Sequence, residues 1–435
     1  MSHTTLSVRV APMDTWFFRE ARPHDAVGAS RLSSQFPPPA GTLIGALRTR
    51  LGDHLGIDWK QHTEQQRCEQ TLQGINLSDL LGTAADTGLL TFGPLQLLQQ
   101  DEKGNDQLLY PTPALLLEQA DSKTTAKKLL RLKPGSAMVC DLSQADEQSQ
   151  LATVIMPELP ANSAGAKPLE NSWITTQGMV ALMKGGLPDA GNIIRQSDLF
   201  ESEARLGIAR DNQKSTVLEG KLYQTEHLRL QPNVELGIDI TLPDAAAEAL
   251  QVSIQQQPIQ RFGGEGRMAY LSTVVADSTS TELTQSLLAA ITKRPNNSSP
   301  HGLILMLQAD AQLDSTLLPG FTMAFEPCPE TGRSRQVWRG VLNGIALTLI
   351  TAVTGKAARK GGWDLQHKKP KGMRSFVPAG SCWFVEVDAA TSLEDAIIAL
   401  NGYVIGGEAT DSLTEQHTDT INGRGTLLCG LWTKR

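Results

Sequence analysis

The stretch of sequence that decides the fold runs from Met13 to Leu55 and reads MDTWFFREARPHDAVGASRLSSQFPPPAGTLIGALRTRLGDHL. In front of it, apolar and polar residues alternate from Leu6 to Val10 and lead into the aromatic run at residues 16–18, which predicts a strand. From Gly41 onward, leucine recurs at every fourth position, which predicts a helix with one buried face. A strand, a loop and a helix in this order open many α/β and α+β domains.

The loop between this strand and this helix carries arginines. They are Arg19, Arg22 and Arg31, in a loop that contains Gly and Ser and can shape itself around a ligand. The helix aims its free backbone N–H groups at this loop, and Arg48 lies at the edge of the apolar stripe, where its guanidinium can stay in water. The arrangement would suit an anion, although arginines in loops are more often solvated surface.

The length and the charge of the chain limit what it can be. A chain of 435 residues is too long for one ordinary domain. Its net charge of −7 is unlike that of a free-standing nucleic-acid binder, which carries a basic excess. An RNA-binding role therefore requires the basic residues to be concentrated locally, while the acidic remainder faces water or protein partners.

Several classes of protein are not indicated by the sequence. No stretch approaches the roughly 20 apolar residues of a membrane span, and the first residues lack the layout of a signal peptide, so we expect a cytoplasmic protein with no membrane partner. The five cysteines form no C-x-x-C and the eight histidines are scattered, so we expect no disulfide framework, no metal site and no cofactor. There is no P-loop and no G-x-S-x-G motif.

The first part of the chain follows a recognisable order of elements. Residues 53–100 are mixed and largely helical in pattern. Residues 101–200 carry repeated loop signals, and we interpret them as an insertion. Residues 206–242 predict paired strands with a turn at Asp211-Asn212, and Asp244 then suits the N-cap of an alanine-rich helix. A strand through Tyr270 follows. Strand, helix, hairpin, helix, strand is the ferredoxin-like βαββαβ order, which here covers residues 1–276.

A second domain is expected after a linker at residues 277–300. The linker includes a short helix that begins at the capping box Thr279–Glu282. Residues 301–435 then repeat the order of elements, with strands at 303–307, 341–353, 377–387 and 426–432 and a helix from the capping box Thr391–Glu394. The predicted class is α+β, with two ferredoxin-like (RRM-like) domains and a large insertion in the first.

The most concentrated positive charge lies at residues 355–374, GKAARKGGWDLQHKKPKGMR. Its cations are Lys356, Arg359, Lys360, Lys368, Lys369, Lys371 and Arg374. Phosphate binding requires such a cluster, because each neutralised phosphate releases counterions, and Trp363 could stack a base. A solvated basic loop explains the charge equally well.

One glycine-rich loop precedes the last strand of each predicted domain. The first contains Gly263, Gly264 and Arg267, and the second contains Gly423, Arg424 and Gly425. Without a Cβ, the backbone can approach a sugar-phosphate chain closely, and adjacent N–H groups can form an anion-binding nest. The first loop opens a strand and lacks the G-x-G-x-x-G spacing, so it is not a dinucleotide fingerprint.

Four blocks of the chain resemble the RAMP superfamily, in particular the third subunit of the Cmr module of type III-B CRISPR effectors. PMDTWFFREARP and SSQFPPPAGTLIGALR fit the family pattern P-L/M-D-x-x-F-F-R-x-x-R-P, then F-P-P-x-x-x-T-x-x-G-A-L-R. Residues 205–223 fit R-x-G-I, a basic hairpin and E-G-x-L-Y. Residues 261–270 and 361–430 contain the glycine-rich loops and GGWD...KKPKGMRSFVPAGSCWF. Glu20-Ala21 and His24 depart from the family pattern.

The resemblance implies a non-catalytic subunit that captures the repeat-derived 5′ tag of a CRISPR RNA (crRNA). Its partners would be the large polymerase-like Palm-domain subunit and the backbone RAMP subunits, and it would meet target RNA only indirectly. The residues expected near the crRNA are Arg19, Arg22, Arg31, Arg48, Gly263, Gly264, Arg267, Lys360, Lys368, Lys369, Lys371, Arg374, Gly423, Arg424 and Gly425.

Two alternatives remain open at this point. One is a metal-independent RAMP endoribonuclease that processes precursor CRISPR RNA, with His24 beside Asp25 as the base that takes a proton from a 2′-hydroxyl. The other is a protein-only scaffold whose acidic surface mediates assembly. Asp14 could also be read as catalytic, but beside Arg19 it is better placed to orient an arginine.

Overall fold

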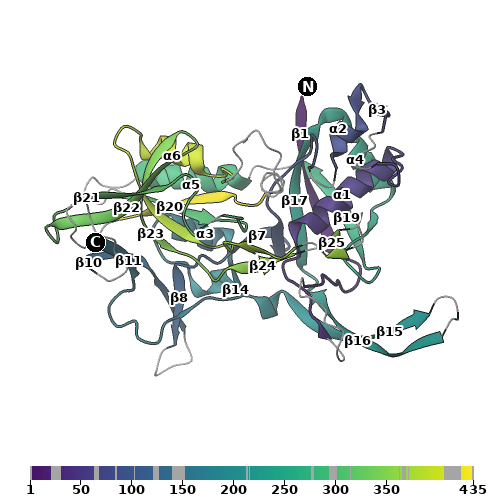
Figure 1. Cartoon of the computed structure of the whole chain (residues 1–435), viewed down its shortest axis with the longest axis horizontal. Coiled ribbons are helices and arrows are strands. Elements are labelled where there is room, and N and C mark those ends of the chain that lie inside the picture. Colours follow the sequence, from purple (N-terminus) through teal and green to yellow (C-terminus); the bar gives the residue numbers. More distant parts are fainter. Residues whose placement is uncertain are drawn as a thin grey trace.

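A computed structural model describes most of the chain. The described residues are 2–20, 31–62, 68–83, 86–101, 103–120, 127–139, 152–211, 214, 216–275, 279–292, 301–313, 315–361, 363–364, 369–370, 372–405 and 423–433. They form mostly strands and a few helices, so the predicted α+β class is confirmed. Two large sheets, of nine and eight strands, lie side by side along the longest axis of the molecule (Figure 1). We call them the first and the second sheet, and the parts of the molecule built around them the first and the second half.

The first sheet is built around the N-terminal strand. Its order is β14 (Ile193–Arg195), β13 (Ser172–Thr175), β7 (Asp106–Pro111), β6 (Gln96–Gln100), β17 (Val234–Pro243), β1 (His3–Pro12), β19 (Met268–Val275) and β18 (Ile259–Arg261), and β5 (Thr91–Phe92) also pairs with β17. Helices α1 (Ala40–His54) and α4 (Asp244–Gln256) pack against each other, and α4 also packs against β1, β17 and β19.

The alternation predicted from the sequence explains this packing. Leu6, Val8 and Val10 of β1 are fully buried, as are Leu43 and Leu47 of α1. They belong to one apolar core together with the inward residues of β17 and α4. Burial of a leucine or valine side chain stabilises a fold by about 1.5–3 kcal/mol, so this stripe holds the helices on the sheet.

The second sheet contains the C-terminal strand. Its order is β10 (Lys133–Val139), β11 (Thr153–Glu158), β22 (Arg333–Leu342), β23 (Ile345–Val353), β28 (Cys382–Val387), β20 (Gly302–Leu307) and β29 (Leu427–Trp432), and β21 (Thr322–Cys328) pairs with β22. Helix α5 (Thr279–Thr292) packs against α6 (Leu393–Leu400), and Leu283 and Leu287 of α5 are buried in the same core as this sheet. The helix predicted in the linker is therefore part of the second core.

The second half departs from the predicted βαββαβ order after its first strand. No helix occurs among the described residues between β20 and β21, where a βαββαβ order would place one. The hairpin of β21 and β22 occupies this part of the sequence, and α5, which precedes β20, packs beside α6.

The segment predicted as an insertion joins the two halves. It supplies β7, β13 and β14 to the first sheet and β10 and β11 to the second. It also forms the small sheet β12 (Lys167–Pro168), β8 (Leu116–Ala120) and β9 (Lys127–Arg131), and helix α3 (Thr176–Met183), which packs on β29 and α5. Buried Arg131 donates hydrogen bonds to the carbonyls of Leu182 and Leu431, at 3.0 Å each, and so fixes α3 to the edge strand β29.

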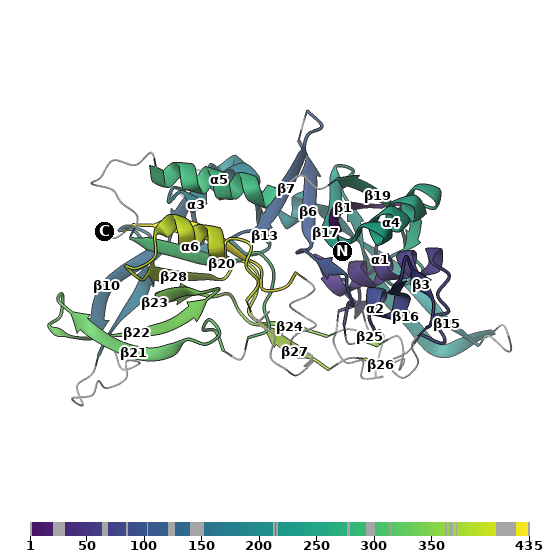
Figure 2. The same cartoon turned by 90° about the horizontal axis from the view of Figure 1, so that it is seen from above.

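Two long appendages leave the sheets. The hairpin of β15 (Phe200–Asp211) and β16 (Thr216–Leu230) projects away from the first half in both views (Figures 1 and 2). The predicted hairpin is confirmed, but Asp211 is the last residue of β15 and pairs with Thr216, and Asn212 lies outside the described residues. The short strand β2 (Arg31–Leu32) pairs in parallel with β16. The second appendage pairs β24 (Ala358–Lys360) with β27 (Arg374–Phe376) and β25 (Trp363–Asp364) with β26 (Lys369–Pro370). It extends from the second half until β25 lies beside the first half (Figures 1 and 2).

Three predictions of local structure are corrected. Asp244 does not cap its helix: its carboxylate accepts hydrogen bonds from the hydroxyls of Ser2 and Thr4, because the N-terminal strand lies alongside. The second capping box is shifted by one residue, since Ser392 caps α6 by accepting from the N–H of Asp395 at 3.1 Å. The predominantly helical pattern expected for residues 53–100 is wrong, because it contains only the end of α1 and α2 (Leu77–Leu81), beside β3 (Thr71–Leu72), β4 (Ile75–Asn76), β5 and β6.

The remaining short helical turns are η1 (Ala190–Asn192) and η2 (Gln196–Asp198). Within the described part of the chain, no helix has both the length and the apolar character needed to cross a bilayer.

Candidate nucleic-acid interface

Asp14 gathers three arginines from distant parts of the sequence. It follows β1, and its carboxylate pairs with Arg205 of β15, Arg229 of β16 and Arg267 before β19, each at 3.1 Å. Glu203 shares Arg205 at 2.7 Å and Arg229 at 2.5 Å. We call these five residues the Asp14 cluster. It contains three cations and two carboxylates, and it lies at the base of the projecting hairpin.

The acids of this cluster are held in the ionised form. Partial burial raises the pKa of Asp14, but the hydrogen bond and the charge of Arg205, together with the charge of Arg229, outweigh burial and leave this pKa below its ordinary value. Hydrogen bonds from Arg229 and Arg205 lower the pKa of Glu203 against a smaller effect of burial. The expectation that Asp14 orients an arginine is confirmed. Its partners are Arg205, Arg229 and Arg267, and not Arg19 as expected.

The first glycine-rich loop closes on the aromatic run beside this cluster. The N–H of Gly264 donates to the carbonyl of Phe17 at 2.8 Å. Gly263 has φ +82°, and a Cβ there would lie 2.7 Å from the same carbonyl. Glycine is therefore required at 263 both for its backbone conformation and for the close approach. The loop brings Arg267 to Asp14.

His227 is buried beside the cluster, opposite Glu203 in the hairpin. Its ring stacks on Phe17 at 5.3 Å and contacts the hydroxyls of Thr15 and Thr225 at 3.2 and 3.1 Å. Burial, then the charges of Arg267 and Arg205, lower the pKa of His227 to about 4. The imidazole is therefore neutral at pH 7 and is part of the support for the arginines.

The other arginines predicted in the N-terminal part have different environments. Arg19 is exposed in an isolated bridge with Ser34. Arg31 pairs with Glu226 at 3.1 Å and keeps 60% of its side chain exposed. Arg48 differs from the expectation of a wet guanidinium: it donates to the carbonyl of Thr83 at 2.7 Å, and burial lowers its pKa. Arg48 fixes the segment after α2.

A second cluster of cations lies in the second half. Lys360 forms an ion pair with Asp310, whose carboxylate also accepts from the N–H of Ala379 at 2.9 Å. Arg374, opposite Lys360 in the β24–β27 pair, donates to Gln312 at 3.4 Å. The guanidinium carbon of Arg424 lies 4.7 Å from the centre of the Phe376 ring, in the geometry of a cation–π contact. We call Asp310, Lys360, Arg374, Phe376 and Arg424 the Asp310 cluster.

The second glycine-rich loop connects this cluster to the first half. The N–H of Gly425 donates to the carbonyl of Asp310 at 3.0 Å. Gly423 has φ +70°, and a Cβ at this position would collide with the carbonyl of Gly93. Gly93 in turn donates to Asp239 of β17 at 2.9 Å. The loop therefore supports the contact between the two halves.

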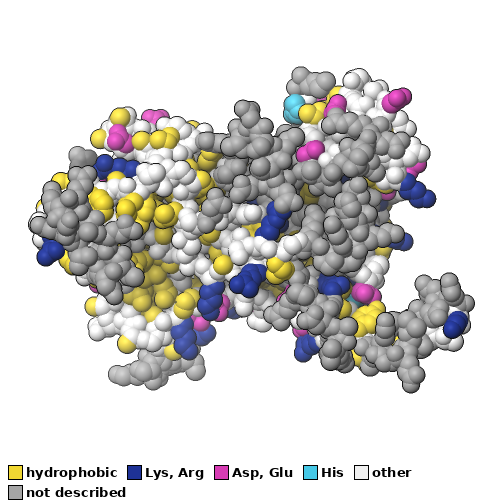
Figure 3. All heavy atoms as spheres, in the orientation of Figure 1, with side chains coloured by type: hydrophobic (Ala, Val, Ile, Leu, Met, Phe, Trp, Pro, Cys, Tyr) yellow, Lys and Arg dark blue, Asp and Glu magenta, His cyan; other side chains and the backbone are white. Residues whose placement is uncertain are grey.

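Part of the predicted site lies outside the described residues. This applies to Arg22, Lys368 and Lys371, and also to His24; only the backbone of Lys369 is described, in β26. On the face shown in Figure 3, Lys and Arg side chains recur below the centre of the molecule, from the region of β24 to the base of the β15–β16 hairpin. A common groove for both clusters stays a prediction.

The sequence contains a signal that could have identified Arg205 and Arg229 as residues of the site. Arg205 lies in the R-x-G-I block, and alternate residues of a strand share a face. Arg229 therefore lies on the face of His227, which is directly opposite Glu203 in the hairpin. What the sequence alone could not show is that Asp14 lies against that face.

The guanidinium groups of these clusters are suited to bind an anion. Arginine has five N–H donors in a fixed fork, so a guanidinium that one or two carboxylates hold keeps donors for a phosphate. Among the residues that the structure describes, no group of three or more His, Cys, Asp or Glu side chains could hold a metal ion.

The fold and these clusters define a class of protein: an α+β chain that gathers arginines at its surface. The family described as CRISPR-associated protein (Cas_Cmr3) matches residues 8–432. The chain therefore belongs to the Cas_Cmr3 family, and its resemblance to the third Cmr subunit is confirmed. No curated protein matches the sequence.

Solved structures of the type III-B Cmr-beta complex contain similar chains. In the complex bound to cognate target RNA, the similar chain has a TM-score of 0.44 at 15% identity, with 99% of each chain covered. In state 1 of the complex with cognate target RNA and AMPPnP, the values are 0.40 and 15%, with 87% of this chain and 86% of that chain covered. In the apo state they are 0.26 and 11%, with 62% and 97% covered. At these TM-scores the similarity supports no conclusion about site geometry.

Proposed function

We propose that this chain is the non-catalytic crRNA-binding subunit of a type III-B Cmr effector complex and that it holds the repeat-derived 5′ tag of the crRNA. The observation that carries the proposal is the Asp14 cluster. It joins the D-x-x-F-F-R block, the R-x-G-I block and the first glycine-rich loop, three separate parts of the family pattern, at one exposed surface.

The charge of this surface suits a ribose-phosphate strand. Two carboxylates hold three guanidinium groups in place and leave one net positive charge, so the arginines are oriented without being neutralised. Rigid arginines lose less conformational entropy when they bind a phosphate than free ones. The neutral, stacked pair of Phe17 and His227 supports the cluster from below. An acidic protein can bind RNA in this way because the cations are local.

The fold is consistent with two RAMP units. The strands β6, β17, β1 and β19 are neighbours in this order, and every adjacent pair is antiparallel. With α1 after β1 and α4 between β17 and β19, this is the arrangement of a ferredoxin-like domain. In the second half β23, β28, β20 and β29 have the same order, with α6 between β28 and β29. We infer that the first helix of the second unit has been replaced by α5.

The partners follow from the family. We infer that the chain contacts the large Palm-domain subunit on one side and begins the filament of backbone RAMP subunits on the other. Target RNA would then meet this subunit only through the guide, and cleavage would belong to other subunits.

The proposal is tested by equilibrium binding of a repeat-derived RNA to the purified chain at several salt concentrations. Charge reversal in the basic segment 355–374, with Lys368→Glu and Lys369→Glu together, should weaken binding and reduce the slope of log K against log salt. Lys167→Glu, at an exposed lysine outside both clusters, is the matched control. The RNA should be recovered intact. An unchanged slope, or metal-independent cleavage of the RNA that His24→Ala abolishes, would contradict the proposal.

A further inference from the structure

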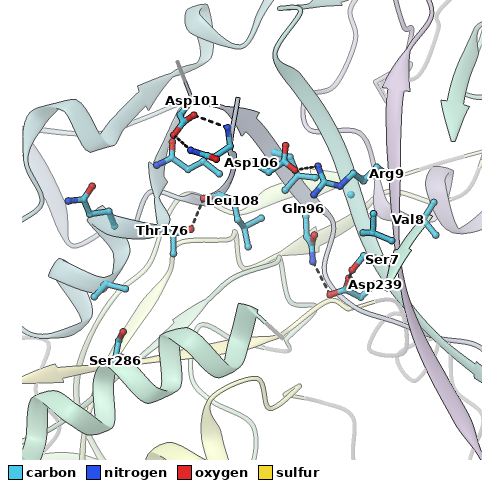
Figure 4. A pocket seen from close by; sticks show the side chains of 17 residues that line it. Ser7, Val8, Arg9, Gln96, Asp101, Asp106, Leu108, Thr176, Asp239 and Ser286 are labelled. Carbon is cyan, nitrogen blue, oxygen red and sulfur yellow. Dashed lines mark hydrogen bonds and ion pairs between the residues drawn. The ribbon is translucent and has the colours of Figure 1, made fainter. Parts of the chain in front are cut away.

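A groove of about 740 Å³ lies between the two halves, and no residue of either basic cluster lines it. One wall is the face of the first sheet opposite α1 and α4, where Ser7 and Arg9 of β1 alternate with the buried Leu6, Val8 and Val10. The other wall carries residues of α3 and α5, which belong to the second core. Figure 4 shows the side chains of this groove, which we call the inter-sheet groove.

The groove is acidic. Its charged residues are Arg9, Asp101, Asp106 and Asp239, which give two net negative charges. Arg9 is already paired with Asp106 at 2.5 Å. Hydrogen bonds from the backbone and the side chain of Asn105 lower the pKa of Asp101, so this carboxylate is ionised at neutral pH. Phosphate groups would be repelled here, which separates this surface from the two clusters.

The groove also offers groups that a peptide can use. The amide of Gln177 and the hydroxyl of Ser286 have no hydrogen-bond partner among the described residues, and both line the groove. Val274 is 44% exposed and, with Leu98 and Leu108, adds apolar surface. Lys and Arg side chains combine an apolar stem with a cationic head, which matches this lining of apolar residues and carboxylates.

We propose that the inter-sheet groove is the docking site for an extended, Lys- or Arg-bearing segment of another protein subunit of the effector complex. The inference rests on the proposed function only in taking the occupant from that complex. Charge complementarity selects the occupant: two net negative charges in a groove that both halves form favour a basic peptide over an acidic one and over RNA.

Site-specific photo-crosslinking tests the proposal in the assembled complex. The photoreactive residue p-benzoylphenylalanine replaces Gln177, and the chain is co-expressed with the other subunits and the crRNA. Mass spectrometry then identifies the cross-linked peptide. We expect a Lys- or Arg-bearing peptide of a protein subunit. Cross-links to RNA, to a second copy of this chain or to a segment without basic residues would overturn the proposal, as would assembly without any cross-link.

Charge neutralisation provides the second measurement. Asp106→Asn with Asp239→Asn should reduce the cross-link yield about tenfold, because the peptide loses its charge partners. Glu248→Gln with Asp189→Asn, at two exposed acids outside the groove, should leave the yield unchanged. An equal yield in both variants would contradict the proposal.

The two proposals fail in distinguishable ways. The groove variant should keep the tag-RNA affinity of the unmodified chain, because no residue of the groove belongs to either cluster. Its thermal stability is measured as well, since Asp106 pairs with Arg9 and the carboxylate of Asp239 accepts hydrogen bonds from Ser7 and Gln96. A chain that binds tag RNA and assembles but gives no cross-link contradicts only the docking site. A chain that neither binds tag RNA nor co-purifies with other subunits contradicts both.

Discussion

The Asp14 cluster and the Asp310 cluster hold their cations by different means. In the first, two carboxylates share three arginines, so the position of each guanidinium depends on the others. In the second, one carboxylate holds Lys360 and an aromatic ring holds Arg424. The comparison teaches that an acidic chain can present ordered cations either by partial neutralisation or by stacking. The shared ion pairs of the Asp14 cluster should therefore be more cooperative, and more sensitive to substitution, than the separate contacts of the Asp310 cluster.

The largest loss of tag-RNA affinity is expected in the Asp14 cluster, where two carboxylates share the arginines. Arg205→Glu with Arg229→Glu should weaken tag-RNA binding on the order of 1000-fold, about 4 kcal/mol, because two charge-assisted contacts are lost and reversed. Lys360→Glu should weaken it only about tenfold. Filter binding at constant salt measures both, with Lys167→Glu as control. Equal effects in the two clusters would remove the distinction between them.

The next effect concerns the loop that closes on Phe17. Gly263→Ala should lower the free energy of unfolding by about 3 kcal/mol, since the backbone conformation is strained for alanine and the added Cβ meets the carbonyl of Phe17 at 2.7 Å. Gly266→Ala has a similar φ of +65° but open space around it, so it should lower stability by about 1 kcal/mol. Chemical denaturation compares them. Equal losses would mean that the close approach is not essential.

The third effect is a pH dependence confined to the first cluster. His227 has a folded pKa of about 4 against 6.5 in a free side chain, so the unfolded chain binds more protons between these values. Stability is therefore lost as pH falls through this window, by about 2 kcal/mol between pH 7 and pH 5. His227→Gln should flatten the curve there. The carboxylates of Asp14 and Glu203, whose pKa values are lowered, should make their own loss at more acidic pH. A curve unchanged by the substitution would show that His227 is not buried neutral.

The smallest effect is expected at the stacked cation. Phe376→Leu removes the ring under Arg424 and should weaken tag-RNA binding by about 0.5–1 kcal/mol, roughly two- to fivefold, because the guanidinium loses its cation–π contact but stays in place. Phe321→Leu, at a buried phenylalanine of the second core that is not part of the cluster, controls for the loss of aromatic packing. A larger change than that of Lys360→Glu would reverse the order proposed for this cluster.

The sequence predicted those parts of the fold that depend on local pattern. The alternation at Leu6, Val8 and Val10 predicted β1, and the leucine spacing predicted α1. The arrangement of the second half could not be predicted in the same way, because α5 joins the second core only through its packing on α6 and through its buried leucines. The division of residues 101–200 between two sheets is likewise a matter of strand pairing across long sequence separations.

The same limit applies to the site. The sequence predicted that Arg267 and the first glycine-rich loop lie near the RNA. Their contacts with Asp14 and Phe17 of the D-x-x-F-F-R block are seen only in the structure. It missed Arg229, which is 215 positions from Asp14 and reaches it only through the fold of the hairpin. The guanidinium of Arg48 was expected to lie in water, because Arg48 lies at the edge of the apolar stripe of α1. In the structure, the segment around Thr83 covers it. Helical periodicity does not reveal which loop covers a helix.

The central claim is that both clusters hold one RNA strand without cutting it. Ultraviolet cross-linking of a repeat-derived RNA to the intact chain, followed by mapping of the cross-linked peptides, tests it most directly. The account predicts cross-linked peptides from the segments around Phe17 and Arg267 and also from the β24–β27 segment, on an RNA recovered at full length. Cross-links confined to the inter-sheet groove, or an RNA shortened by the purified chain, would contradict it.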